Sequence, residues 1–199
     1  LVVGVNMMFL PSTLVGFAAA GLTSPSGKAF VFDARANGFI RAEGCGAGVL
    51  QEAATEGAAA IAGSSVRQDG RSASLTAPNG RAQQRLLNAV LADACTTSSE
   101  LQLVEAAANG SSLGDPIEAS AIAATLLVAR DQGVALPVGS VKANVGHTES
   151  ASGMVGLSKL LSAVRCTRAA PNAQLTVVAG DSTTLQMAGR TVGNARWRR

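Results

Sequence analysis

The sequence contains few of the residues that usually mark a catalytic or recognition site. Its 199 residues include no tyrosine, one tryptophan and one histidine, and aromatic residues make up only 3%. The three cysteines, Cys45, Cys95 and Cys166, are odd in number and lack CxxC spacing, which argues against a zinc site and a disulfide framework. Reduced, intracellular thiols are therefore expected, and the core is expected to consist of aliphatic side chains.

Charged residues are also scarce. They make up 15% of the chain against 47% hydrophobic residues, a composition that is typical of a globular core and not of disorder. The formal net charge is +3, and several arginines gather at the C-terminus. Because no aromatic interleaving or nucleic-acid motif accompanies them, a solvated basic tail is favoured over a surface that binds nucleic acid, a membrane or an acidic protein.

The first 27 residues carry no charge, which raises the question of a membrane span or a signal sequence. Asn6, Pro11 and Ser12 interrupt the apolar run and argue against both. We predict instead a strand, a turn and a helix that lie inside a domain. The protein is expected to be intracellular, in the cytoplasm or a plastid, with any targeting segment upstream of residue 1.

The order of apolar segments predicts alternating strands and helices. Residues 1–9 are continuously apolar, which is typical of a strand buried on both faces in a parallel sheet between helix layers. Segment 44–48, GCGAG, lacks the lysine and the GxGxxG frame of a phosphate loop, so a strand that packs closely against a helix is favoured. Asn79 is a predicted N-cap. Predicted strands cover 1–9, 44–48, 58–65, 101–106 and 138–141, and predicted helices cover 13–22, 80–94, 117–129 and 150–164.

The single histidine, His147, falls between the predicted strand 138–141 and a small-residue helix that begins near Glu149. A lone histidine is usually structural, but strand-to-helix connections commonly display reactive side chains. Gly146 allows backbone geometry that is closed to other residues, and Lys142 could reach the same pocket. Because a nearby lysine disfavours the cationic ring, a neutral hydrogen-bond donor is the predicted role of this histidine.

Four segments resemble motifs of the β-ketoacyl synthases, specifically the ketosynthase domains of modular polyketide synthases, and they occur in the family's order. The segment KANVGHTE at 142–149 resembles the family's second-histidine motif. The others are FDARANGFIRAEGCG at 32–46, QDGRSASLTAPNG at 68–80 and GDPIE at 114–118. The resemblance implies an α/β thiolase-like fold with layered α-β-α-β-α architecture. Residues 1–63 would be the end of its N-terminal half, 64–177 most of its C-terminal half, and 178–199 a divergent basic tail.

The resemblance also implies an acyltransferase of polyketide or fatty acid biosynthesis, which condenses acyl and malonyl thioesters with loss of carbon dioxide. His147 would be the hydrogen-bond donor and Lys142 its supporting residue, while Asn144, Glu149 and Lys159 would tie the loop to the helix. The substrates would be carried on the phosphopantetheine of an acyl carrier protein, so no cofactor or metal is expected on this chain. Cys45 would be a packing residue.

Three departures from the family pattern bear on activity. Ala107 stands where the family has its first catalytic histidine, and the Gly-Phe-Gly-Gly motif expected near the C-terminus does not occur. The nucleophilic cysteine would lie in a motif upstream of Leu1. We therefore expect the chain alone to be unable to complete the condensation.

Two alternatives stay open beside that interpretation. One is a catalytically inactive protein with a structural or interaction role, and the other is a ketosynthase that transfers acyl groups without condensing them. A gene fragment with no role of its own is a third possibility. In each case we expect a homo-oligomer or a complex with the missing N-terminal half, because strand 1–9 would otherwise leave an unpaired edge.

Overall fold

The structure is a computed structural model that describes residues 1–52, 57, 59–74, 76–128, 130 and 136–179. It contains four short strands and four α-helices longer than one turn in these ranges. The strands are β1 (Val2–Asn6), β2 (Gly44–Gly48), β3 (Val104–Glu105) and β4 (Val138–Gly139). The helices are α1 (Pro11–Ala19), α2 (Gly80–Asp93), α3 (Gly114–Ile122), the single turn α4 (Lys142–Val145) and α5 (Ser152–Cys166), with a π-helical extension of α3 over Ala123–Leu127 and 3-10 turns at Ser98–Glu100 and Glu149–Ala151.

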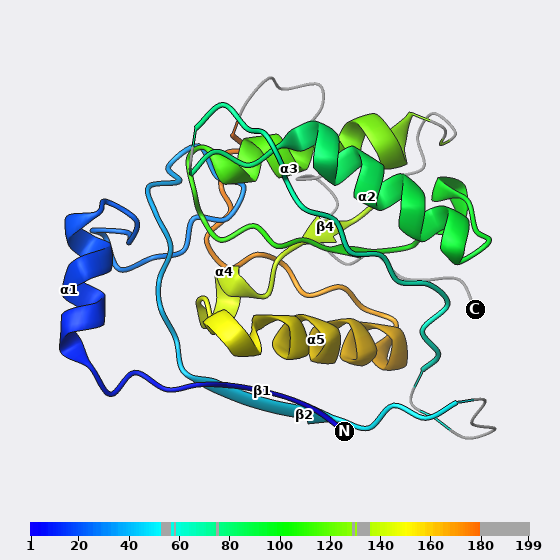
Figure 1. The fold of residues 1–199 in the computed structure, drawn as a ribbon, viewed down its shortest axis with the longest axis horizontal. Coiled ribbons are helices and arrows are strands. Elements are labelled where there is room, and N and C mark those ends of the chain that lie inside the picture. Colours follow the sequence, from blue (N-terminus) through cyan, green and yellow to red (C-terminus); the bar gives the residue numbers. More distant parts are fainter. Residues whose placement is uncertain (53–56, 58, 75, 129, 131–135, 180–199) are drawn as a thin grey trace.

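The elements form successive layers (Figure 1). Helices α2 and α3 pack on one another on the outside, and the parallel pair β3–β4 lies beneath them. Helix α5 follows, and the antiparallel pair β1–β2 covers its other side, so that α5 contacts strands of both sheets. This order corresponds to four of the five predicted layers.

The core lies between α3, β3 and β4 and the segment before β2. Phe32 from that segment packs with Ile122 and Leu126 of the α3 region and with Val138 of β4. Helix α2 adds Leu87 and Leu91 at the edge of this cluster, as their helical spacing predicts. Asn79 caps the helix, since its Oδ1 accepts from the N–H groups of residues 81 and 82 at 3.1 and 3.2 Å. The aliphatic core and this cap were both predictable from the sequence.

The prediction for residues 1–9 is wrong in part. A strand forms over Val2–Asn6, but it pairs antiparallel with β2 and only Gly4 is buried. Leu1 is 85% and Phe9 78% exposed. The reason is that, within the described ranges, β2 is the only strand beside β1 and α5 covers only one of its faces.

Two further predictions of local structure need correction. Residues 59–65 form no strand, and Ser64 instead donates its N–H to Asp93 Oδ2 at the end of α2, at 2.7 Å; residue 58 lies outside the described residues. Cys45 is exposed and is not a packing residue. Side chains alternate along β2, so that Gly46 and Gly48 face Met154 of α5, Gly44 faces the turn just before α5, and Cys45 points away.

The glycines of β2 allow α5 to approach closely. A Cβ at Gly46 would lie 2.8 Å from Met154 Cβ, so a larger residue could not occupy this position without a shift of α5. Gly156 plays a similar role toward Glu105, whereas Gly153 faces open space and does not pack, although it belongs to the small-residue helix seen in the sequence.

None of the described helices is both long and apolar enough to cross a membrane. The predicted tail from residue 180 onward lies outside the described residues.

Candidate functional site

The backbone around His147 is fixed by contacts with residues 40–42. The His147 N–H donates to the carbonyl of Ile40 at 2.6 Å, and the N–H of Ala42 donates to the carbonyl of His147 at 2.9 Å. Gly146 precedes the histidine with φ +82°, and a Cβ there would lie 3.0 Å from Ala42 Cβ. Both the positive φ and the close approach require glycine, as the sequence indicated.

The imidazole of His147 has a defined hydrogen-bonding pattern. The Glu149 N–H donates to Nδ1 at 2.9 Å, and the Ser152 hydroxyl lies 2.9 Å from the same atom. An N–H group can only donate, so Nδ1 is an acceptor and the proton of the neutral ring lies on Nε2. Burial, together with the charge of Lys142, lowers the pKa of His147. The ring is therefore a neutral donor through Nε2 at neutral pH.

Lys142 joins this histidine to the loop that contains Ala107. Its side chain is buried, and Nζ donates to the carbonyl of Ala107 at 2.6 Å. The N–H of Ala107 donates to Glu118 Oε1 at 2.7 Å, so both peptide groups of residue 107 are held by buried side chains, those of Lys142 and Glu118. Burial lowers the pKa of Lys142, while Glu118 and Glu105 oppose that shift. The predicted site residues Lys142 and Ala107 thus lie in direct contact.

Asp115 holds the rest of this loop. Its carboxylate, which is fully enclosed, accepts the N–H groups of Asn109, Gly110 and Ser111 at 3.0 to 3.2 Å, and also that of Phe32 at 3.0 Å. Burial raises the pKa of Asp115, and these four donors counteract the rise. In the sequence, Asp115 stood out only as part of the GDPIE segment that carries the family resemblance. The signal that could have found it was a carboxylate placed just after a Gly- and Ser-rich loop whose N–H groups need acceptors.

Three residues were expected to tie the loop to the helix, but their side chains contact other segments of the chain instead. Asn144 donates through Nδ2 to the carbonyl of Pro171 at 3.0 Å. Glu149 pairs with Arg41 at 2.5 Å, and Lys159 pairs with Glu105 at 2.8 Å. Arg41 was not predicted from the sequence, although it lies in the segment that carries the family resemblance.

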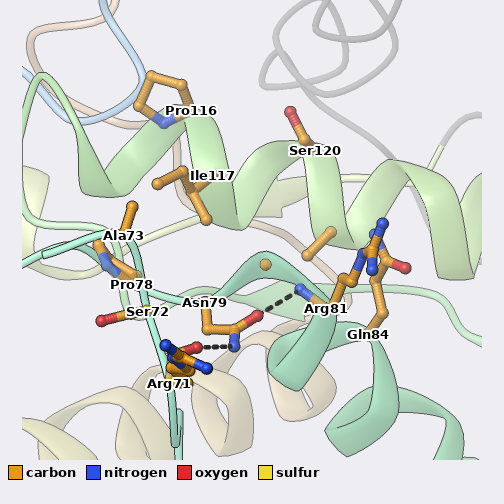
Figure 2. A pocket seen from close by; sticks show the side chains of 12 residues that line it. Arg71, Ser72, Ala73, Pro78, Asn79, Arg81, Gln84, Pro116, Ile117 and Ser120 are labelled. Carbon is orange, nitrogen blue, oxygen red and sulfur yellow. Dashed lines mark hydrogen bonds between the residues drawn. The ribbon is translucent and has the colours of Figure 1, made fainter.

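A separate hollow of about 690 Å³ lies between the loop before α2, the first turn of α2 and α3 (Figure 2). It contains no carboxylate among its lining residues, and none of the three predicted site residues reaches it. Its lining residues are Arg71, Ser72, Ala73, Pro78, Asn79, Gly80, Arg81, Gln84, Pro116, Ile117, Ser120 and Ala121. Within the described ranges, no group of histidine, cysteine or acidic side chains is arranged to hold a metal ion.

The layers and the two loops are those of a thiolase-like ketosynthase fold. Residues 1–56 match the N-terminal domain of β-ketoacyl synthases, and residues 58–176 match their C-terminal domain. The chain belongs to the β-ketoacyl synthase family, which confirms the resemblance seen in the sequence.

Relatives and solved structures agree on the polyketide synthase type. The chain is 44% identical over 175 residues to a component of the phenolphthiocerol/phthiocerol polyketide synthase of Mycobacterium tuberculosis, covering 85% of this chain and 9% of that protein. It is 42% identical to the pikromycin polyketide synthase component PikAII of Streptomyces venezuelae over 168 residues, which are 81% of this chain and 4% of that protein. The ketosynthase from module 6 of the bacillaene synthase of Bacillus subtilis superposes with a TM-score of 0.83 at 31% identity, covering 88% of this chain and 32% of that one. The chain thus spans about a third of a solved ketosynthase and less than a tenth of these two curated relatives.

Proposed function

We propose that this chain supplies the histidine side of a polyketide synthase ketosynthase site in which acyl transfer is retained and condensation is impaired. The observation that carries the proposal is the juxtaposition through Lys142. On one side His147 presents a proton on Nε2, and on the other Ala107 offers only a methyl group. Substrates would be acyl and malonyl groups on an acyl carrier protein.

The chemistry explains why the two steps separate. In the condensation, the carboxyl group of a malonyl thioester leaves as carbon dioxide and its bonding electron pair enters an enolate, which then attacks the acyl carbonyl. The enolate oxygen needs hydrogen-bond donors, whereas acyl transfer needs a thiolate, which the family resemblance places upstream of Leu1. Ala107 removes one donor, and the loss of a single donor of this kind costs roughly 10²- to 10³-fold in rate. His147 remains as the other.

A chimera tests the proposal directly. Residues 1–176 would replace the matching third of the wild-type bacillaene ketosynthase, which would provide the upstream cysteine. We expect normal acyl loading and slow release of carbon dioxide from malonyl carrier protein. Ala107→His should raise release by roughly 10²-fold or more, and His147→Ala should abolish the residual rate. Ser112→His, on the exposed part of the same loop, is the control and should change neither step.

Two results would contradict this function: rapid decarboxylation with Ala107 in place, or a rate that does not respond to His147→Ala. The second result would favour a purely structural role. That candidate is supported by the charged framework around Ala107, which persists without the imidazole. It is also supported by the exposed apolar residues Leu1, Phe9 and Leu10, through which we propose that the chain associates with a copy of itself or with the upstream part of a ketosynthase domain. A compact monomer in light scattering at high concentration would argue against that association.

A further inference from the structure

Glu149 links the histidine to a residue outside its own segment. Its backbone adopts a left-handed conformation with φ +45°, which is uncommon for a residue with a side chain, and its N–H donates to His147 Nδ1. Such a conformation costs on the order of 1–3 kcal/mol and persists only where the surroundings enforce it. The position of the Glu149 N–H on His147 Nδ1 therefore depends on the contacts that hold Glu149 in this conformation.

Arg41 provides that hold through a two-pronged ion pair. Its Nε and Nη2 atoms contact the two Glu149 carboxylate oxygens at 2.5 and 3.2 Å, and the Arg41 side chain is only 6% exposed. Bidentate pairs between arginine and a carboxylate fix geometry as well as charge. The pair lowers the pKa of Glu149, so the carboxylate stays ionised.

Aromatic contacts brace the same arrangement from α1. The guanidinium of Arg41 lies 5.3 Å from the ring centre of Phe17, and Phe17 packs edge-on against Phe39 at 5.9 Å. Phe39 in turn contacts the His147 ring at 5.4 Å. The imidazole thus contacts Glu149, which pairs with Arg41, and it also contacts Phe39. Phe17 packs against both Arg41 and Phe39 and so connects the two sets of contacts.

We propose that Arg41 is a positioning residue that sets the tautomer of His147. By holding Glu149 in its left-handed conformation, Arg41 keeps the Glu149 N–H on Nδ1 and the ring proton on Nε2. The sequence left open whether Lys142 or a backbone group fixes the tautomer; the Lys142 ammonium is directed at the Ala107 carbonyl, and the group on Nδ1 is the Glu149 N–H. Arg41 lies in the part of the chain that matches the N-terminal family domain, and His147 in the part that matches the C-terminal one, so one half of the fold adjusts the histidine of the other.

The competing support is Ser152, whose hydroxyl also lies 2.9 Å from Nδ1. A hydroxyl can donate or accept, so it accommodates either tautomer, whereas the Glu149 N–H accommodates one. Loss of the arginine should therefore leave a mixture of tautomers. The charged groups that act on the ring are Lys142, Glu149 and, through its pair with Glu149, Arg41.

The chain is well suited to a direct test because His147 is its only histidine. Nitrogen NMR of the histidine-labelled full chain reports which ring nitrogen carries the proton. The wild-type ring should be protonated on Nε2. Arg41→Met should lower the ratio of the Nε2 to the Nδ1 tautomer about fivefold, the effect of losing one ordinary hydrogen bond. It should also raise the pKa of His147, since the donor that favours the neutral ring is lost.

Two further variants separate geometry from charge. Arg41→Lys keeps the positive charge but not the two-pronged guanidinium, so its tautomer ratio should lie between those of wild type and Arg41→Met. Arg81→Met removes the same charge from α2 and should leave the His147 signals unchanged. If Arg41→Met does not fold, Glu149→Gln removes the ion pair while keeping the N–H, with the same expected loss.

An unchanged tautomer ratio in a folded Arg41→Met or Glu149→Gln variant would overturn the proposal. The importance of the tautomer for turnover rests on the proposed function, but the NMR measurement does not require activity. A chimera that fails the decarboxylation test while the tautomer still responds to Arg41 would reject the function and leave the positioning role in place.

Discussion

The two loops of the site, residues 107–111 and 146–149, differ in the atoms that are hydrogen-bonded when the loop is held in place. The first is held by Asp115, Glu118 and Lys142, and each of these contacts reaches backbone atoms. In the second, the Glu149 N–H reaches the imidazole itself. A histidine can therefore be lost from position 107 without loss of its loop, whereas His147 is part of the structure that supports it. This difference supports the proposal that the first loop keeps its scaffold although Ala107 offers no donor.

Removal of the Asp115 carboxylate should have the largest effect, because the first loop relies on it. Asp115→Ala would leave the N–H groups of Phe32, Asn109 and Gly110 without an acceptor, while that of Ser111 keeps Asn109 Oδ1, and we expect the free energy of unfolding to fall by about 3–4 kcal/mol. Urea unfolding followed by circular dichroism measures this. Asp69→Ala, an exposed acid on the loop before α2, is the matched control and should change the free energy by less than about 0.5 kcal/mol. Equal effects of the two substitutions would show that the loop does not depend on Asp115.

The sequence alone singled out the candidate site residues whose type is rare in this chain or in their segment. His147 is the only histidine, Gly146 precedes it, and Lys142 is one of few charges in an apolar stretch, so each stands out without a structure. The layered fold followed from the order of four motifs, and the family match and the superposed ketosynthase confirm it. The Asn79 cap followed from local chemistry alone.

The parts that were missed depend on contacts between distant segments. Arg41 and Glu149 are 108 positions apart, and no local pattern marks them as partners. The exposure of Cys45 follows from which face of β2 meets α5, which the alternation of small residues does not specify. Strand 1–9 was predicted to be buried from its apolar character, but burial requires neighbours on both faces, and composition does not reveal whether they are present.

The pH dependence of stability should separate the second loop from the first. Burial and Lys142 hold the pKa of His147 below its ordinary value of 6.5, so the unfolded chain takes up this proton at a higher pH than the folded chain. The unfolding free energy contributed by His147 is therefore intact above pH 6.5 and falls as the pH drops below it. Glu118 has the opposite effect on the unfolding free energy. Burial raises its pKa in the folded chain, so above the ordinary pKa of 4.5 the folded chain keeps a proton that the unfolded chain has lost, and this contribution falls as the pH rises.

Comparison of wild type with His147→Gln isolates the histidine, because Glu118 is present in both. Urea unfolding at a series of pH values should show that wild type loses more stability than the variant as the pH falls below 6.5. With one histidine in the chain, no other imidazole contributes to the difference. Parallel curves would mean that His147 titrates alike in the folded and unfolded chains, and that its environment does not favour the neutral ring.

The smallest effect is expected from a histidine at position 107, where the family resemblance places one. Ala107→His adds a side chain at an exposed position whose peptide groups are already held by Glu118 and Lys142, so the unfolding free energy should change by less than about 0.5 kcal/mol. Ala108→His, one residue further along, is the matched control. Ala108 is only 4% exposed and belongs to the core cluster, so an imidazole there should cost about 2 kcal/mol or more through overpacking and the burial of polar nitrogens. Urea unfolding of the two variants side by side measures the contrast. A loss of stability at position 107 as large as that at 108 would mean that the first loop has no room for an imidazole at this position, contrary to the proposed function.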